Sequence, residues 1–156
     1  MDTIEGTRTT SAAEQLGLTD PLLDALIGAW RVDRAIGTRR VQNDARVAWT
    51  LAHQFVQIHM IDVASPPQYE ALVHIGGDGH GGYVAYWLDT FGGPFSARGV
   101  GTRDGDSFIF AFQDADGSLR NTFTRDPAAD TWRSLIEQQR AGGPWSVFCE
   151  DRWVRR

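Results

Sequence analysis

Residues 95–125 read FSARGVGTRDGDSFIFAFQDADGSLRNTFTR, and this stretch decides the class of fold. It contains three runs rich in aromatic and β-branched residues, which are 95–102, 107–113 and 118–125. The turn sequences Asp104-Gly105-Asp106 and Asp116-Gly117 separate these runs. Short apolar runs joined by Asp-Gly turns are typical of antiparallel hairpins. The stretch therefore predicts three consecutive antiparallel strands.

The same pattern of short apolar runs separated by turn sequences continues on both sides of this stretch. Seven more runs are predicted as strands: 29–36, 45–52, 54–63, 68–75, 82–90, 131–139 and 145–154. About ten strands with short loops leave no residues for a crossover helix, so a parallel sheet is excluded. Consecutive hairpins favour a closed up-and-down barrel over a sandwich, because closure also removes the exposed edge strands. The sequence therefore predicts an all-β antiparallel barrel.

One short helix is predicted before the first strand. Asp20 is a favoured N-cap, Pro21 suits the first helical position, and Gly28 ends the apolar stripe that follows. We expect this helix to cap one end of the barrel. The 156 residues make one domain, 19–156, after a tail, 1–18, that shows no periodicity and is expected to be flexible.

The amino-acid composition excludes some kinds of chemistry and some classes of binding partner. All 15 basic residues are arginine, so Schiff-base and P-loop lysine chemistry are excluded. The net charge of −5 and the absence of long runs of like charge argue against nucleic acid and anionic membranes. A polar N-terminus without an apolar run and a single cysteine, Cys149, favour a cytoplasmic protein. We expect a hydrophobic small-molecule partner, and a homodimer stays open.

Two further sequence patterns resemble those of a known family. Gly28-Ala29-Trp30 opens the first strand directly after the helix, and Trp153 stands near the chain end with Arg152, Arg155 and Arg156. This resembles the calycin superfamily of lipocalin-like barrels, in which a signature tryptophan packs across the closed end against a late arginine. Together with Asp89-Thr90-Phe91-Gly92, the segment 101–106 and Asp151-Arg152-Trp153, the pattern is similar to an uncharacterised lipocalin-like bacterial family. The resemblance covers residues 20–156 and implies a lipocalin-like barrel.

The nitrobindins, which bind haem and belong to the same superfamily, also open with Gly-x-Trp. Here Arg31 and Val32 follow the tryptophan without that family's extra glycine spacing, and the last histidine is His80. A late-strand haem ligand is therefore missing. We expect no haem and no other cofactor, with a histidine elsewhere in the chain as the open alternative.

Strand parity predicts which side chains face the barrel interior. The drier alternating sets are Val47, Trp49 and Leu51; Tyr69, Ala71, Val73 and Ile75; Phe108, Phe110 and Phe112; and Trp145, Val147 and Cys149. The mixed strands add Tyr83, Trp87, Asp89, Asn121, Phe123, Trp132, Ser134, Ile136 and Gln138. Apolar walls with a few polar groups are typical of small-molecule pockets. We predict that a ligand contacts Trp49, Tyr69, Trp87, Phe110, Asn121, Trp132 and Gln138.

Two function classes follow from this interior. The first is a module that binds an apolar or aromatic small molecule. The second is a cofactor-independent enzyme, an isomerase, cyclase or lyase, with Asp89 as acid or base and His59 or Tyr83 as its partner. Burial among aromatic residues would raise the pKa of Asp89, but Asp89 also suits a hydrogen-bonding role in the turn that follows it. A barrel filled by its own side chains is the third alternative.

Other chemistries find little support in the chain. The parity of strand 54–63 is ambiguous, so His59 faces either the interior or solvent. His74, Asp78 and His80 have no firm third ligand, and no metal site is expected. Cys149 lies in an apolar strand run, where a thiol is inert.

Overall fold

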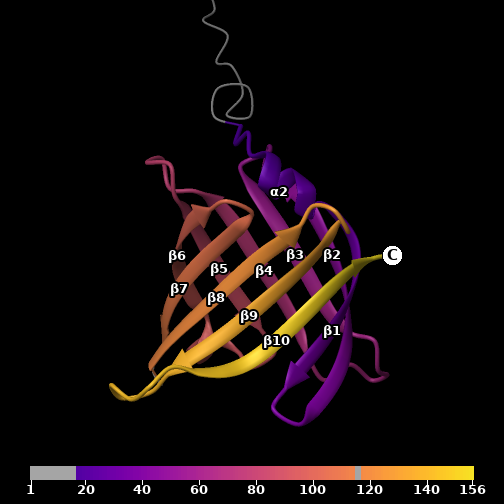
Figure 1. The fold of residues 1–156 in the computed structure, drawn as a ribbon, viewed down its shortest axis with the longest axis vertical. Coiled ribbons are helices and arrows are strands. Elements are labelled where there is room, and N and C mark those ends of the chain that lie inside the picture. The colour runs from indigo at the N-terminus through magenta and orange to yellow at the C-terminus, as the bar shows by residue number, and fades with distance from the viewer. Residues whose placement is uncertain (1–16, 115–116) are drawn as a thin grey trace, which may run out of the picture.

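The computed structural model describes residues 17–114 and 117–156 and is a closed antiparallel barrel of ten strands (Figure 1). Each strand pairs with its neighbours in sequence, and β1 pairs with β10 to close the barrel. The strands are β1 (Gly28–Ile36), β2 (Arg39–Thr50), β3 (Phe55–Asp62), β4 (Glu70–Gly77), β5 (Tyr83–Asp89), β6 (Ala97–Asp104), β7 (Ser107–Asp114), β8 (Gly117–Asp126), β9 (Thr131–Gln139) and β10 (Ser146–Arg155). The predicted fold class is confirmed. None of the helices in the described residues is long and apolar enough to span a membrane.

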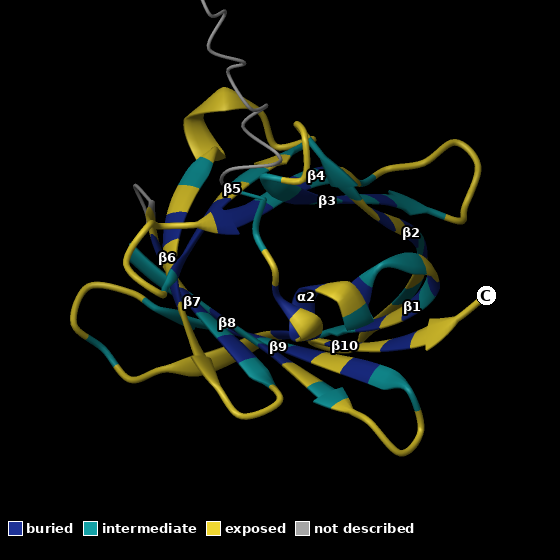
Figure 2. Cartoon of the chain, turned by 90° about the horizontal axis from the view of Figure 1, so that it is seen from above, coloured by how far each residue is buried: buried dark blue, intermediate teal, exposed yellow. Residues whose placement is uncertain are grey.

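The helix α2 (Pro21–Leu26) covers one end of the barrel, as the view from above shows (Figure 2). It begins at Asp20, whose carboxylate accepts the backbone N–H groups of Leu22 at 2.9 Å and Leu23 at 3.0 Å. Both leucines and Leu26 are buried in the core. Asp20 thus satisfies two N–H groups at the start of the helix while the leucine stripe closes the barrel.

Trp30 and Arg155 join this helix to the last strand. Trp30 is fully buried, and its indole N–H donates to the carbonyl of Leu26 at 2.8 Å. The guanidinium of Arg155 lies 4.2 Å from the centre of the indole ring and donates to two backbone carbonyls near the end of α2, each at 2.9 Å. The predicted packing of a late arginine on Trp30 is confirmed, and Arg155 is that arginine.

Position 28, the first of the Gly-x-Trp sequence, requires glycine because of its backbone conformation and because there is no room for a side chain. Its φ is +139°, and a Cβ there would lie 2.6 Å from Nη1 of Arg155. A side chain would both strain the backbone and displace the guanidinium from the helix end.

Glycines on β6 shape the aromatic core. Gly99 and Gly101 stand opposite Phe112 and Phe110 on β7, and a Cβ at either glycine would lie within about 2.5 Å of the facing ring. The rings therefore lie over backbone rather than over side chains, which leaves Phe110 2% exposed and Phe112 6% exposed. The predicted inward facing of both phenylalanines is confirmed.

Three predictions of facing are wrong. Leu51 is 65% exposed, because residues 51–53 all adopt positive φ and form the turn between β2 and β3. Trp145 and Val147 are 38% and 61% exposed, because β10 begins only at Ser146 and its register shifts by a bulge between Val147 and Cys149. Beyond the bulge the same parity points inward, so Cys149 is buried.

The predicted flexible tail falls mostly outside the described residues. Within them, Leu18 packs against the core, and its N–H donates to the carbonyl of His53 at 3.2 Å. The segment that folds therefore begins before α2.

Candidate functional site

The barrel holds an internal cavity of about 610 Å³ towards the end opposite α2. The hairpin β1–β2, the loops β3–β4, β5–β6 and β9–β10, and the start of β8 surround it. Its wall carries several aromatic residues: Tyr69, Trp87, Phe91, Phe95, Phe112 and Phe148. Arg39 and Arg140 stand exposed at its rim. The interior is therefore not filled by its own side chains.

Four of the seven residues predicted to contact a ligand line this cavity: Tyr69, Trp87, Asn121 and Gln138. The other three do not. Phe110 and Trp132 are buried in the core, and the indole N–H of Trp49 donates to Asp24 beside α2 at 2.9 Å. Parity placed these three on the correct face but carries no information about depth along the barrel.

Asp89 lines the cavity with three donors already on its carboxylate. The indole N–H of Trp87 donates to Oδ2 at 3.1 Å and the hydroxyl of Tyr69 donates to the same oxygen at 3.4 Å. The backbone N–H of Phe91 donates to Oδ1 at 3.0 Å. Asp89 thus has the turn-capping role that the sequence left as the alternative to acid or base chemistry.

Tyr69 connects Asp89 to a buried ion pair. The pKa of Tyr69 is raised to about 12 in the folded protein. Burial is the largest cause, the nearby charge of Arg34 acts against it, and the nearby charge of Asp89 adds to it. The guanidinium of Arg34 lies 5.1 Å from the centre of the Tyr69 ring. A phenol with this pKa stays protonated at neutral pH, so Tyr69 acts there as a hydrogen-bond donor.

The ion pair between Arg34 and Asp151 is the feature of the wall that sequence reasoning missed. Nε of Arg34 donates to Oδ1 of Asp151 at 2.9 Å, and the hydroxyl of Ser134 donates to Oδ2 at 2.9 Å. Both charged side chains are at most 5% exposed. Burial alone would lower the pKa of Arg34, but attraction to Asp151 and to Cys149 outweighs it and raises the pKa above its ordinary value. The sequence did contain a signal that Arg34 faces inward, because Arg34 has the same strand parity as Trp30 and Val32.

Cys149 completes this cluster. Its Sγ lies 2.9 Å from Oδ1 of Asp151 and accepts from Nη2 of Arg34 at 3.4 Å. Burial, followed by the nearby carboxylate, raises the pKa of the thiol to about 12. The thiol is therefore protonated at neutral pH and unsuited to nucleophilic chemistry.

Neither residue named as a partner for Asp89 lies beside it. His59 faces outward on β3, where Val56, Ile58 and Met60 take the interior positions. Its Nε2 lies 2.6 Å from the Glu70 carboxylate, and its side chain is 38% exposed. The ambiguity of strand 54–63 thus resolves against an interior histidine.

Tyr83 belongs to the capped end of the barrel. Its hydroxyl donates to Oδ2 of Asp20, the N-cap of α2. Burial, then the hydrogen bond and the charge of Asp20, raise the pKa of Tyr83 to about 12. Tyr83 therefore holds the helix on the barrel and does not line the cavity.

The three residues considered above as metal ligands, His74, Asp78 and His80, form hydrogen bonds with other protein groups. The ring Nε2 of His74 lies 3.1 Å from Oε1 of Gln57, and Asp78 accepts the backbone N–H groups of His80 and Gly82 at 2.7 and 2.9 Å. In the part of the chain that the structure describes, no group of three His, Cys, Asp or Glu side chains could hold a metal ion.

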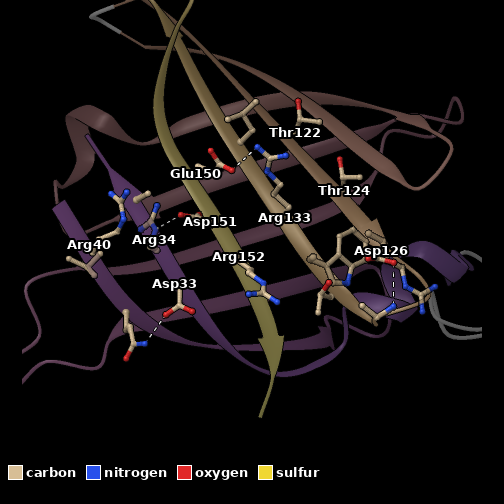
Figure 3. A pocket seen from close by; sticks show the side chains of 18 residues that line it. Asp33, Arg34, Arg40, Thr122, Thr124, Asp126, Arg133, Glu150, Asp151 and Arg152 are labelled. Atoms are coloured by element: carbon tan, nitrogen blue, oxygen red, sulfur yellow. Dashed lines mark hydrogen bonds and ion pairs between the residues drawn. The ribbon is translucent and has the colours of Figure 1, made fainter. Parts of the chain in front are cut away.

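A second hollow, of about 1130 Å³, lies on the outside of the barrel across β2, β1, β10, β9 and β8 (Figure 3). It is larger and more open than the internal cavity. Threonines and charged side chains line it, and its ion pair Arg133–Glu150 spans 2.6 Å. Trp132 is the only predicted site residue among those that border it, and Trp132 itself is buried in the core. We therefore take the internal cavity as the candidate site.

These features define a ten-stranded antiparallel barrel with one capped end and an internal cavity towards the other. No family model matches the chain, and no curated protein matches it. Among solved structures it is similar to the crystal structure of Rv2717c from M. tuberculosis, with a TM-score of 0.64 and 15% sequence identity over 89% of this chain and 99% of that one. At this identity the likeness shows the fold alone.

Proposed function

We propose that the protein binds an apolar or aromatic small molecule in the internal cavity. The carrying observation is the cavity itself, because about 610 Å³ falls within the range of roughly 300–1,000 Å³ that small-molecule sites occupy. Apolar and aromatic side chains form the larger part of its wall, and polar and charged side chains form the rest, among them Asn121, Gln138, Asp89, Asp62, Arg34, Arg39 and Arg140. This composition suits an apolar body with a limited polar edge.

We also propose that the barrel is of the calycin type. The support is the Gly28-x-Trp30 sequence after the capping helix, together with Arg155 stacked on the Trp30 ring. A closed end of this kind leaves the opposite end for a ligand. The cytoplasm is the proposed compartment, supported by the single free cysteine, Cys149.

We favour binding over the enzymatic alternative because the carboxylate of Asp89 already accepts hydrogen bonds from the protein. Its carboxylate accepts from Trp87, Tyr69 and the backbone of Phe91, so proton transfer to a ligand would disrupt this network. Tyr69, its nearest titratable neighbour, has a pKa of about 12 and is a weak acid at neutral pH. A carrier requires neither group to exchange a proton.

The test is a titration with the neutral hydrophobic probe N-phenyl-1-naphthylamine. We expect a saturable rise in probe emission and a parallel quenching of tryptophan fluorescence. Replacing Trp87 by Phe should reduce the quenching, because Trp87 lines the cavity. The same change at Trp49 should leave it intact, because Trp49 lies beside α2.

A second pair of variants tests the location independently. Ala97 and Arg98 are neighbours on β6; Ala97 lines the cavity, and Arg98 is exposed on the outer face. Ala97→Phe should weaken probe binding by filling the cavity, and Arg98→Phe should not. An unsaturable response of the wild-type protein, or equal effects of the two variants, would contradict the proposal.

A further inference from the structure

Two arginines at the mouth of the cavity carry charges without a protein partner. Arg39 begins β2 and Arg140 directly follows β9; both side chains line the cavity, and both residues are exposed. Among the residues that the structure describes, neither guanidinium forms an ion pair or a hydrogen bond, whereas eight other arginines pair with carboxylates. The mouth therefore presents two positive charges that a ligand can reach.

Their position distinguishes these two arginines from others without a counter-charge. Four more arginines lack a carboxylate partner within the described ranges, namely Arg40, Arg46, Arg98 and Arg152. All four are exposed, and none of them lines the internal cavity. A solvated arginine on an outer face is ordinary, but an arginine at a cavity mouth meets whatever enters the cavity.

The backbone holds both arginines in place at the mouth. Arg39 pairs with Ile36 across the β1–β2 hairpin. The carbonyl of Arg140 accepts the N–H of Gly143 at 2.8 Å, and the side-chain amide of Gln139 donates to the carbonyl of Gly143 at 2.8 Å. Both side chains border one cavity of about 610 Å³, so a molecule that fills it comes near both guanidinium groups.

The two carboxylates of the cavity wall are already hydrogen-bonded within the protein. Oδ1 of Asp62 accepts from the side chain of Asn43 at 2.7 Å, and its Oδ2 accepts the backbone N–H groups of Gln68 and Tyr69, each at 2.9 Å. Asp89 accepts from three donors. Neither carboxylate neutralises the arginines at the mouth.

Depth decides where a charged group of a ligand fits. Inside the barrel, Arg34 is paired with Asp151 and both side chains are at most 5% exposed, so an anion there would have to break a buried ion pair. At the mouth, an anion beside Arg39 or Arg140 breaks no pair and stays in contact with water, which keeps its desolvation cost low. A negatively charged group therefore fits at the mouth and not at the bottom of the cavity.

Aromatic rings lead from the mouth into the cavity. Phe95 and Phe91 are 45% and 68% exposed, and their ring centres are 6.4 Å apart. Phe91 in turn lies 6.1 Å from Tyr69, and Trp87 and Phe112 lie edge to face in the same wall at 6.2 Å. Flat rings pack well against such surfaces.

We infer that the ligand is an aromatic anion whose rings lie against this aromatic wall and whose carboxylate or sulfonate group stays at the mouth beside Arg39 and Arg140. This rests on the proposed function. The net charge of −5 gives the protein no general attraction for anions, so a preference for an anion has to come from the charges at the mouth.

The test compares two probes that differ by one group. N-phenyl-1-naphthylamine is neutral, and 1-anilinonaphthalene-8-sulfonate is the same molecule with an added sulfonate. The double variant Arg39→Gln with Arg140→Gln should bind the sulfonate about five- to twenty-fold more weakly than the wild type, because each exposed charge pair contributes up to about five-fold in affinity. The affinity for the neutral probe should change by less than about two-fold, and each single variant should lose part of the affinity for the sulfonate.

A matched control removes the same charge from the outer face. Arg40 follows Arg39 in β2 and lines the outer hollow, as Arg152 does. Arg40→Gln with Arg152→Gln changes the net charge equally but should alter the affinity for the sulfonate by less than about two-fold. Raising the salt concentration from about 0.01 M to about 1 M should weaken binding of the sulfonate to the wild type and leave the neutral probe nearly unaffected.

The position of the bound sulfonate is tested with Ala97→Phe, which fills the cavity and should weaken binding of both probes. Four outcomes would overturn the anion inference and leave the proposed function standing: binding of the neutral probe alone, equal losses of sulfonate affinity in the two double variants, no loss in either, or sulfonate binding that Ala97→Phe leaves intact. If neither probe binds, both proposals fail.

Discussion

The buried ion pair of Arg34 and Asp151 allows a sharp test of how burial, rather than distance, decides the strength of an interaction. Arg34→Met removes one charge and keeps most of the side-chain volume. The Asp151 carboxylate, 3% exposed, is then left without its counter-charge. We expect a strong loss of stability from this single change.

The magnitude follows from the burial of both partners. Breaking a buried ion pair by removing one partner costs about 3–5 kcal/mol, because an uncompensated charge remains inside. For a domain of this size each kcal/mol lowers the melting temperature by about 2–4 °C, so the expected drop is about 6–20 °C. Arg34→Met with Asp151→Asn should recover much of it, since the amide still accepts from Ser134 and carries no charge.

A matched control lies on the outer face. Arg133 and Glu150 are closer than the buried pair, at 2.6 Å against 2.9 Å, but their side chains are 62% and 47% exposed. Exposed pairs contribute about 0–1 kcal/mol, so Arg133→Met should lower the melting temperature by less than about 4 °C.

The assay is thermal unfolding followed by circular dichroism, with urea unfolding as a check on cooperativity. Equal losses for Arg34→Met and Arg133→Met would refute the reasoning. So would a double variant less stable than Arg34→Met alone, because the penalty would then not come from the unpaired carboxylate.

Three further predictions concern stability. Trp30→Ala should cost about 3–5 kcal/mol, since it empties a fully buried site and removes the ring under Arg155; an unchanged melting curve would contradict this. Asp89→Asn should cost about 1–3 kcal/mol in urea unfolding, because one carboxylate oxygen that accepts hydrogen bonds becomes an NH₂ group; unchanged stability would reopen the enzymatic alternative. Tyr69 loses its proton near pH 10 when unfolded and near pH 12 when folded, so the unfolded state binds fewer protons in this window and stability falls as pH rises through it. Tyr69→Phe should flatten that fall in melting temperature, and a slope equal to that of the wild type would contradict the raised pKa.

The barrel could be predicted from sequence because its signals are local. Turns such as Asp104-Gly105-Asp106 and the alternation within runs such as 107–113 depend on neighbouring residues only. The errors arise where the local signal competes with another. The bulge before Cys149 changes which residues of 145–154 face inward, and alternation alone does not reveal an inserted residue.

The candidate site was predicted in part, for a different physical reason. Parity predicts which face of a strand a residue occupies but not which inward-facing residues border empty space. Phe110 and Asn121 pair across β7 and β8 and were both predicted as ligand contacts, but only Asn121 lines the cavity. Arg34 was overlooked because an arginine is expected in water unless a partner is known. That partner, Asp151, lies 117 residues away in the chain and becomes adjacent only through the closure of β1 on β10.

The position of the cavity follows from how bulk is distributed along the barrel. At the capped end, Trp30, Trp132 and Trp153 are all at most 1% exposed, and the leucines of α2 close the space above them. Towards the other end, the small Ala97 and the polar Gln138 stand beside aromatic residues such as Trp87 and Phe112 in the cavity wall. The three buried tryptophans and the leucines of α2 fill the capped end, so the empty space of the barrel lies towards the other end, where Trp87 stands in the cavity wall. Large residues at the capped end thus stabilise the fold, and small and polar residues at the other end leave room for a ligand, so variants such as Trp30→Ala and Ala97→Phe should separate stability from binding.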